Sequence, residues 1–279
     1  MLAQRIITAV ILLALLLPTL AIDDARPFLL LTMLMIGAAA WEWARLTHGQ
    51  GGALAILSGL ALAGGCALAS RYLDQSRALQ PLWWLATSLW VIGGGLALRA
   101  GPRGWLRVPA GLRWALGLAL LGLAWMALAK ARVMGVNFLL SVMCIVWVAD
   151  ISAYFGGRAF GGRKLAPTIS PGKTWAGAYC GVAGALGLAL LWWLADNRWS
   201  PASPSVFTLL YRAGGPLGLA AALVALAGLS VVGDLFESLV KRAAGAKDSS
   251  QLLPGHGGVL DRVDALLPVL PAALALASL

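Results

Sequence analysis

Four acidic side chains toward the end of the chain fall into two pairs with helical spacing. Asp234 and Glu237 are three residues apart in a largely apolar stretch, and Asp261 and Asp264 repeat that spacing in the next one. Side chains three residues apart lie on one face of a helix. Two carboxylates together with substrate phosphates are the usual way of holding Mg²⁺. The pattern therefore predicts Mg²⁺ bound by Asp234 and Asp261, where it would neutralise phosphate charge during an in-line displacement.

The same acids also have structural explanations. Asp261 would be stabilised in the first turn of a helix by the positive end of the helix dipole. Asp234 could form an ion pair with Lys241 or Arg242, which follow it closely in the chain. Glu42 stands between two tryptophans, and we expect its carboxylate to reach toward the membrane interface. The sequence alone leaves these alternatives open.

The segment between the acidic pairs, residues 237–258, is suited to bind an anion. Gly255, Gly257 and Gly258 allow backbone amides to approach a ligand closely. His256 could donate to a phosphate, shuttle a proton or merely stabilise the turn. The basic side chains that could share phosphate charge here are Lys241, Arg242, Lys247 and Arg262.

A second polar segment, residues 156–174, is also rich in glycine and cations. Its basic and hydroxyl side chains are Arg158, Arg163, Lys164, Lys173, Ser170 and Thr174. Residues 172–174 read Gly-Lys-Thr, like the end of a P-loop, but Pro167 occupies the position of the first glycine and excludes that motif. The composition predicts a cradle for a polyphosphate, and a basic loop that faces lipid is the alternative.

These polar groups are embedded in a very apolar chain. Of 279 residues, 60% are hydrophobic and 11% are charged, whereas soluble domains carry about 25% charged residues. The composition predicts an all-α integral membrane protein, because lipid can cover apolar surface that a soluble core of this size could not use. The net charge of +10 is spread over short loops, which favours membrane lipids over nucleic acid as a partner.

About nine apolar stretches are long enough to cross a membrane. They cover residues 6–22, 27–45, 53–70, 82–98, 112–129, 136–155, 175–195, 216–236 and 259–279. The last stretch contains Pro268 and Pro271, which predict a kink. We divide the chain into N-terminal transmembrane helices, residues 1–130 with about five spans, and a C-terminal catalytic region, residues 131–279, with both polar segments.

The basic residues are distributed unequally between the two sides of such a bundle. The N-terminus and the even-numbered loops carry about two thirds of the 21 lysines and arginines. Cytoplasmic loops are enriched in these residues. The distribution therefore predicts a multi-pass protein of the plasma (inner) membrane with a cytoplasmic N-terminus and an outside C-terminus. Both polar segments would then face the cytoplasm.

Residues 238–264, SLVKRAAGAKDSSQLLPGHGGVLDRVD, closely resemble the signature of the phosphatidate cytidylyltransferases, or CDP-diacylglycerol synthases. Every signature position is filled, by Ser238, Lys241, Arg242, Lys247, Asp248, Ser250, Leu253, Pro254, His256, Gly257, Gly258, Asp261, Arg262 and Asp264. An upstream stretch is also similar, through Asp150, Ala153, Tyr154, Gly157, Lys164, Pro167, Ser170, Pro171, Lys173, Thr174 and Trp175. One position departs from the pattern. The family usually carries a glutamate where this chain has Ala176, which puts in doubt any cation contact made by that acid.

The resemblance implies the reaction of CTP with phosphatidate to give CDP-diacylglycerol and pyrophosphate. It implies Mg²⁺ on Asp234 and Asp261, a second cation close by, and a homodimer. The implied catalytic residues are Asp234, Asp261, Lys241, Arg242, Lys247 and His256. The implied substrate contacts are Asp150, Lys164, Ser170, Lys173, Thr174, Asp248, Gly257, Gly258, Arg262 and Asp264. The alternatives are another membrane phospholipid transferase with a different nucleotide, or a secondary transporter.

Overall fold

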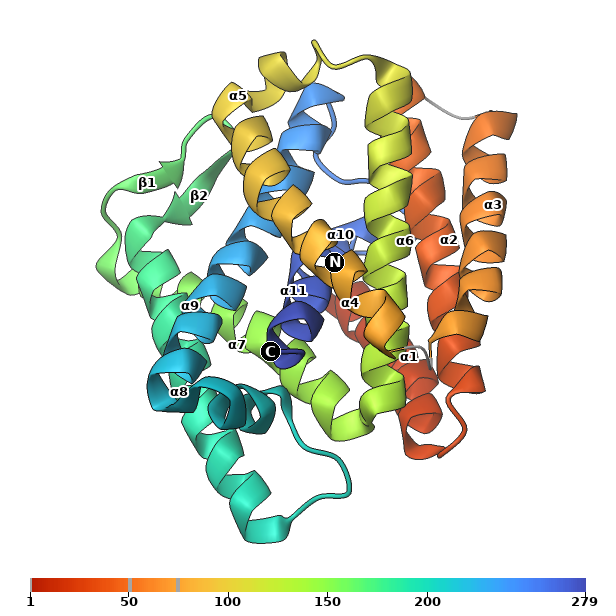
Figure 1. The fold of residues 1–279 in the computed structure, drawn as a ribbon. Helices are drawn as coiled ribbons and strands as arrows, with labels where there is room; N and C mark the ends of the chain where they lie inside the picture. Colours follow the sequence, from red (N-terminus) through yellow and green to blue (C-terminus); the bar gives the residue numbers. More distant parts are fainter. Residues whose placement is uncertain (1, 50–51, 74–75) are drawn as a thin grey trace.

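Long helices pack against one another, and shorter helices lie among them (Figure 1). The computed structural model describes residues 2–49, 52–73 and 76–279. The helices are α1 (Leu2–Ala21), α2 (Arg26–His48), α3 (Ala53–Ala69), η1 (Ser70–Tyr72), α4 (Ser76–Ser88), η2 (Leu89–Gly94), α5 (Gly95–Trp105), α6 (Ala110–Met134), α7 (Val136–Phe160), α8 (Trp175–Trp199), α9 (Val206–Ala243), α10 (Leu260–Val263) and α11 (Leu266–Ala277). Within these described ranges, seven helical segments are long and apolar enough to cross a membrane. The all-α class and its apolar helices agree with the composition, whereas nine spans are not confirmed.

The last predicted span, residues 259–279, is divided into two short helices. The helix is interrupted after α10, at Asp264 and Ala265. Pro268 has no backbone N–H to donate to the carbonyl of Asp264, which explains an interruption at this place. Nearly every side chain of α11 is buried among the other helices. The apolar side chains of α11 are therefore part of the protein core. Hydropathy alone does not distinguish such a helix from one that faces lipid.

Helices α7 and α8 approach each other closely through glycines. A Cβ atom placed on Gly177 would lie 2.7 Å from the carbonyl oxygen of Ala153, and one on Gly181 would lie 3.0 Å from that of Ala149. No larger side chain fits at either position without separating the helices. This contact fixes the end of α7 that carries Asp150 against the start of α8, where the second polar segment ends.

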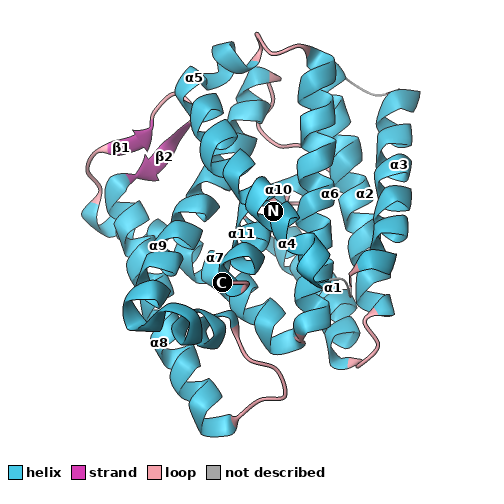
Figure 2. Cartoon of the chain, in the orientation of Figure 1, coloured by secondary structure: helices cyan, strands magenta, loops and turns pink. Residues whose placement is uncertain are grey.

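The second polar segment contains two short strands that the sequence reading did not predict (Figure 2). Strands β1 (Lys164–Ala166) and β2 (Ser170–Thr174) are antiparallel, with Lys164 opposite Thr174 and Ala166 opposite Ser170. The side chain of Thr174 then caps α8, because its hydroxyl oxygen accepts a hydrogen bond from the amide of Gly177 at 3.1 Å. The hairpin is thus tied directly to the start of a long helix.

Successive loops of the chain lie alternately at the two ends of the helix bundle, as expected from the sequence. At one end, Thr8 of α1 donates to the carbonyl of Pro254, and the α2, α5 and α9 termini line a shared cavity. At the other end, Arg132 of α6 donates to the carbonyl of Ile22, and Gln80 of α4 donates to that of Ser278. The side chains of Arg5 and Arg77, which enter the basic count, lie outside the described part of the chain. The first end carries both polar segments.

A buried carboxylate holds the connection between α8 and α9 at the end opposite these segments. Asp196 accepts hydrogen bonds from the Asn137 amide at 3.0 Å, the Ser205 hydroxyl at 2.5 Å and the Thr208 hydroxyl at 2.6 Å. Removal of the carboxylate leaves these donors buried without a partner, which costs about 3 kcal/mol or more. We expect Asp196→Ala to lower the thermal unfolding temperature clearly in detergent, whereas Asp23→Ala on the exposed surface should not. Equal unfolding temperatures for the two variants would contradict this role.

Candidate active site

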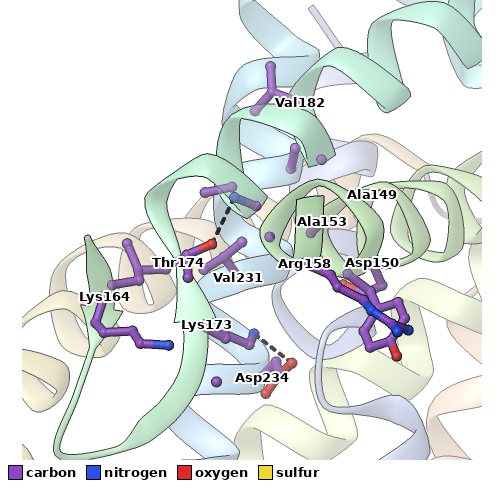
Figure 3. Close-up of a pocket in the computed structure, with 18 of the residues that line it drawn as sticks. Ala149, Asp150, Ala153, Arg158, Lys164, Lys173, Thr174, Val182, Val231 and Asp234 are labelled. Atoms are coloured by element: carbon purple, nitrogen blue, oxygen red, sulfur yellow. Dashed lines mark hydrogen bonds and ion pairs between the residues drawn. The ribbon is translucent and has the colours of Figure 1, made fainter. Parts of the chain in front are cut away.

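A cavity of about 550 Å³ lies between α7, α8, α9 and the β1–β2 hairpin (Figure 3). Many side chains around it are small or apolar, such as Ala153, Val182 and Val231. Its charged and hydroxyl side chains are Asp150, Tyr154, Arg158, Lys164, Lys173, Thr174 and Asp234. The cavity therefore combines an apolar wall with a cluster of cations and carboxylates. It brings the hairpin of the second polar segment against Asp234 of the first acidic pair.

An ion pair between β2 and α9 connects the two polar segments. Lys173 Nζ lies 2.6 Å from Asp234 Oδ2, and the two side chains point toward each other in Figure 3. Both are only partly exposed, at 25% and 30% of their side-chain surface, so water screens the pair weakly. The alternative pairing of Asp234 with Lys241 or Arg242 is wrong in this structure, because the hairpin folds back and provides the cation.

Asp261 is the centre of a second polar cluster. Lys241 Nζ lies 2.5 Å from Asp261 Oδ1 and also pairs with Glu237 on its own helix. The second oxygen of Asp261 accepts hydrogen bonds from the amide and the hydroxyl of Ser249, both at 2.9 Å, and from the amide of Gly258 at 2.8 Å. Burial alone raises the pKa of Asp261, but its neighbours Glu237 and Lys241 and these amides outweigh burial and hold the pKa below its usual range.

Glu42 is a site residue whose role the sequence reading missed. The expectation that its carboxylate reaches the membrane interface is wrong, because the residue is completely buried. One oxygen accepts from the Ser250 hydroxyl at 2.6 Å and the Val259 amide at 3.0 Å. The other accepts from the Ser249 hydroxyl at 3.1 Å and the Leu260 amide at 2.7 Å. Glu42 of α2 thus connects the two sides of the loop that carries Asp261.

The glycines of this loop make room for the two carboxylates. Gly257 has a φ of 84°, and a Cβ atom there would lie 2.7 Å from Asp261 Oδ2. A Cβ atom on Gly258 would collide with the Ser249 hydroxyl and with Glu42. The amide of Gly258, which the sequence offered to an external anion, therefore donates to the internal carboxylate of Asp261. Contacts of Gly257 and Gly258 with a substrate stay a prediction.

Asp264 stands next to Asp234 because α9 and α11 approach closely at Gly233. A Cβ atom on Gly233 would collide with the backbone oxygen of Asp264, and it would lie 2.9 Å from the Pro268 ring. Burial raises the pKa of Asp264 to about 7, and the negative charge of Asp234 adds to this effect. Asp264 is therefore protonated more readily than an exposed carboxyl.

The other predicted residues lie around these clusters. Arg242 is exposed and donates to the carbonyl of Ala246, and Arg262 donates to the carbonyl of His256. The ring nitrogen Nδ1 of His256 is buried and has no hydrogen-bond partner within the described residues. Lys247 and Asp248 line a separate cavity between the ends of α2, α5 and α9. The site is therefore spread over two cavities.

The donor set fits one mode of metal binding. No group of three His, Cys, Asp or Glu side chains within the described ranges is arranged to hold a metal ion. Mg²⁺ is commonly bound by one or two carboxylates, with substrate phosphates and water completing its shell. Among the described residues, Asp234 pairs with Lys173 and Asp261 with Lys241. Both carboxylates could act in this way once these lysines turn aside.

The apolar helices and the charged cavity beside them define a multi-pass membrane protein with a site suited to phosphates. The chain belongs to the Cytidylyltransferase family, which matches residues 3–279. A phosphatidate cytidylyltransferase from Pseudomonas aeruginosa is 38% identical over 284 residues, which cover 99% of this chain and 97% of that relative. A phosphatidate cytidylyltransferase from Haemophilus influenzae is 47% identical over 49% of this chain and 44% of its own length. One from Brucella abortus is 45% identical over 59% of this chain and 54% of its own length.

Ala176, where this chain departs from the family pattern, lies outside both cavities. It is the second residue of α8 and does not line the cavity that contains Lys173. A glutamate in the first turn of a helix interacts favourably with the dipole, worth about 0.3–1 kcal/mol. We therefore expect Ala176→Glu to raise the unfolding temperature slightly and to change kcat/KM less than about threefold, or roughly 0.7 kcal/mol. A rise in kcat above tenfold would show instead that the acid takes part in the reaction.

Proposed function

We propose that this protein is a phosphatidate cytidylyltransferase, which converts CTP and phosphatidate into CDP-diacylglycerol and pyrophosphate. The observation that supports this most directly is the 550 Å³ cavity, whose apolar wall ends at the Lys173–Asp234 pair. A lipid with a phosphate headgroup has the same division between apolar chains and anionic end. The Pseudomonas aeruginosa relative that carries this name aligns with 99% of this chain.

The reaction is a displacement at phosphorus. An oxygen of the phosphatidate phosphate forms a bond to the α-phosphorus of CTP, and the bond from that phosphorus to the bridging oxygen of the β-phosphate breaks. Pyrophosphate leaves with the bonding electrons. The attacking phosphate is already an anion near neutral pH, so the step does not depend on a strong general base. Lys173, Lys241 and Lys247 would share the negative charge of the phosphates, together with Arg242 and Arg262.

Asp234 and Asp261 would hold Mg²⁺, which supplies electrostatic stabilisation of the phosphates when it is bound. In the absence of substrate, Lys173 and Lys241 neutralise these carboxylates. Both lysines are then placed to turn from the carboxylates to arriving phosphates, since a Lys side chain is a flexible donor with three N–H groups. A second cation beside Mg²⁺ and a homodimer stay predictions.

A cytoplasmic position of the site would suit both substrates. CTP is water-soluble, and phosphatidate has its phosphate at the membrane surface. The end of the bundle with both polar segments also carries most of the lysines and arginines, which supports a cytoplasmic orientation of that end and an outside C-terminus in the inner membrane. Cysteine labelling near residue 103 and near residue 200, in intact and in opened cells, would test the orientation.

The reaction has a direct test with purified protein in detergent. Pyrophosphate should be released from CTP only when phosphatidate and Mg²⁺ are both present, and CDP-diacylglycerol should form in equal amount. Full activity with UTP and none with CTP would refute the assignment of CTP as the nucleotide substrate. Transport of a solute by proteoliposomes without any lipid product would favour a transporter instead.

A further inference from the structure

A second cavity, of about 750 Å³, lies at the same end of the bundle and is lined quite differently from the first. It is formed by the end of α2, Leu106 after α5, Arg113 in the first turn of α6, and residues 243–251 from the end of α9 onward. Its side chains are mostly charged or hydrogen-bonding, namely Arg45, Thr47, Arg113, Lys247, Asp248, Ser249, Ser250 and Gln251. Two of these, Arg45 and Arg113, belong to no predicted site segment.

The cations of this cavity lack a carboxylate partner. Among the described residues, neither Arg45 nor Arg113 nor Lys247 forms an ion pair. The Nε atom of Arg113 is buried and has no hydrogen-bond partner. Arg45 is held over the ring of Trp41, with its guanidinium carbon 4.5 Å from the ring centroid. A buried donor without a partner costs free energy. A bound anion would supply the acceptor that these cationic groups lack.

The second cavity is connected to the reacting carboxylates through Ser249. The residue lines the cavity, and its amide and hydroxyl both donate to Asp261 at 2.9 Å. Asp234, the other proposed metal ligand, lines the first cavity. Asp261 itself lines neither cavity, so Ser249 is the residue that links it to the second cavity.

We propose that the Arg45–Arg113–Lys247 cavity binds the nucleoside triphosphate of the reaction. Three cations against the one carboxylate of Asp248 leave a net positive charge, which suits a polyphosphate. Thr47 and Gln251 provide further hydrogen-bonding groups for the polar remainder of the ligand. The volume lies within the range of small-molecule sites, about 300–1,000 Å³. This inference rests on the proposed function for the identity of the nucleotide as CTP.

The test compares Arg45→Gln, Arg113→Gln and the double variant with the matched control Arg107→Gln. Arg107 is exposed in the α5–α6 connection and lines neither cavity. The dissociation constant of CTP would be measured by calorimetry in detergent without phosphatidate, and KM would be measured for each substrate. We expect CTP to bind at least tenfold more weakly to each variant, with a parallel rise in its KM. The KM for phosphatidate should change less than threefold, and the control should match the wild type.

The outcomes separate this inference from the proposed function. If the wild type forms CDP-diacylglycerol and the variants bind CTP normally, the nucleotide lies elsewhere and the inference is overturned alone. If no product forms but CTP binding still depends on both arginines, the proposed nucleotide site is supported and the proposed reaction is refuted. Anionic lipid is the other source of phosphate. Unchanged CTP binding with an altered response to phosphatidylglycerol vesicles would assign the cavity to a headgroup and overturn the proposal.

A steric variant keeps the test valid if the arginine variants fold poorly. Ala246 lines the second cavity and is not a charged residue. Ala246→Phe should narrow the space and weaken CTP binding by a similar factor, without removal of a cation. Normal CTP binding by a well-folded Ala246→Phe protein would count against the proposal.

Discussion

Asparagine in place of Asp234 or Asp261 should reduce kcat at least about a hundredfold, which is a loss of about 2.7 kcal/mol of transition-state stabilisation. Each substitution keeps the size of the side chain and removes its charge. The positive charge of Lys173 would then lose the carboxylate at position 234, or that of Lys241 the carboxylate at position 261. The proposed Mg²⁺ would lose a charged ligand in either case. Pyrophosphate release at saturating CTP and phosphatidate is the measurement.

The control for this prediction is Asp23→Asn, because Asp23 is exposed and far along the chain from both cavities. Thermal unfolding of all three variants would show whether lost activity reflects lost structure. The apparent Mg²⁺ requirement should rise in any residual activity of the Asp234 variant. Activity within tenfold of the wild type for either carboxylate variant would remove that residue from the list of proposed metal ligands.

Glu42→Ala should have the second largest effect, although Glu42 lines neither cavity. It leaves the Ser250 hydroxyl and the amides of Val259 and Leu260 without their acceptor, and the Ser249 hydroxyl with Asp261 alone. Loss of groups that orient metal ligands typically costs 10- to 100-fold in activity. We therefore expect kcat to fall about 10- to 100-fold.

A positioning role for Glu42 can be separated from a general loss of stability. Thr32→Ala removes another buried hydrogen-bonding side chain of α2, far from the Asp261 loop, and should lower stability without a large change in kcat. Glu42→Gln retains one good acceptor but turns an NH₂ group toward donors on its other side, so kcat should lie between those of the wild type and Glu42→Ala. Equal kcat values for Glu42→Ala and Thr32→Ala would refute the positioning role.

The sequence predicted which polar side chains are candidates for the site better than it predicted the contacts around them. Asp234, Lys241 and Asp261 were identifiable because helical spacing and a long local signature place them within a short stretch. The contact between Lys173 and Asp234 was not predicted, because it depends on how a hairpin folds back onto α9. The strands themselves are too short for an alternating pattern to indicate them.

Two further features could not be predicted from sequence patterns, for a different physical reason. Glu42 lies more than 200 residues from the donors that it binds, and nothing local distinguishes a buried acceptor from an acid at the membrane surface. The apolar sequence of α11 is the same whether lipid or protein covers it, and only packing reveals that protein does. Helix positions follow from local composition, whereas partners across the bundle follow from the assembled fold.

The length of α9 has a consequence for the membrane in which the protein works. The helix has 38 residues and is broken at Gly215, where φ is 63°. The part after the break, residues 216–243, is about 42 Å long, compared with about 30 Å for the hydrocarbon core of a bilayer. A thinner bilayer would leave more of this helix in water, and a thicker one would draw its charged end inward. We therefore expect the position of the α9 end that carries Asp234 and Lys241, relative to the bilayer surface, to depend on membrane thickness and so on the acyl-chain length of the host lipids.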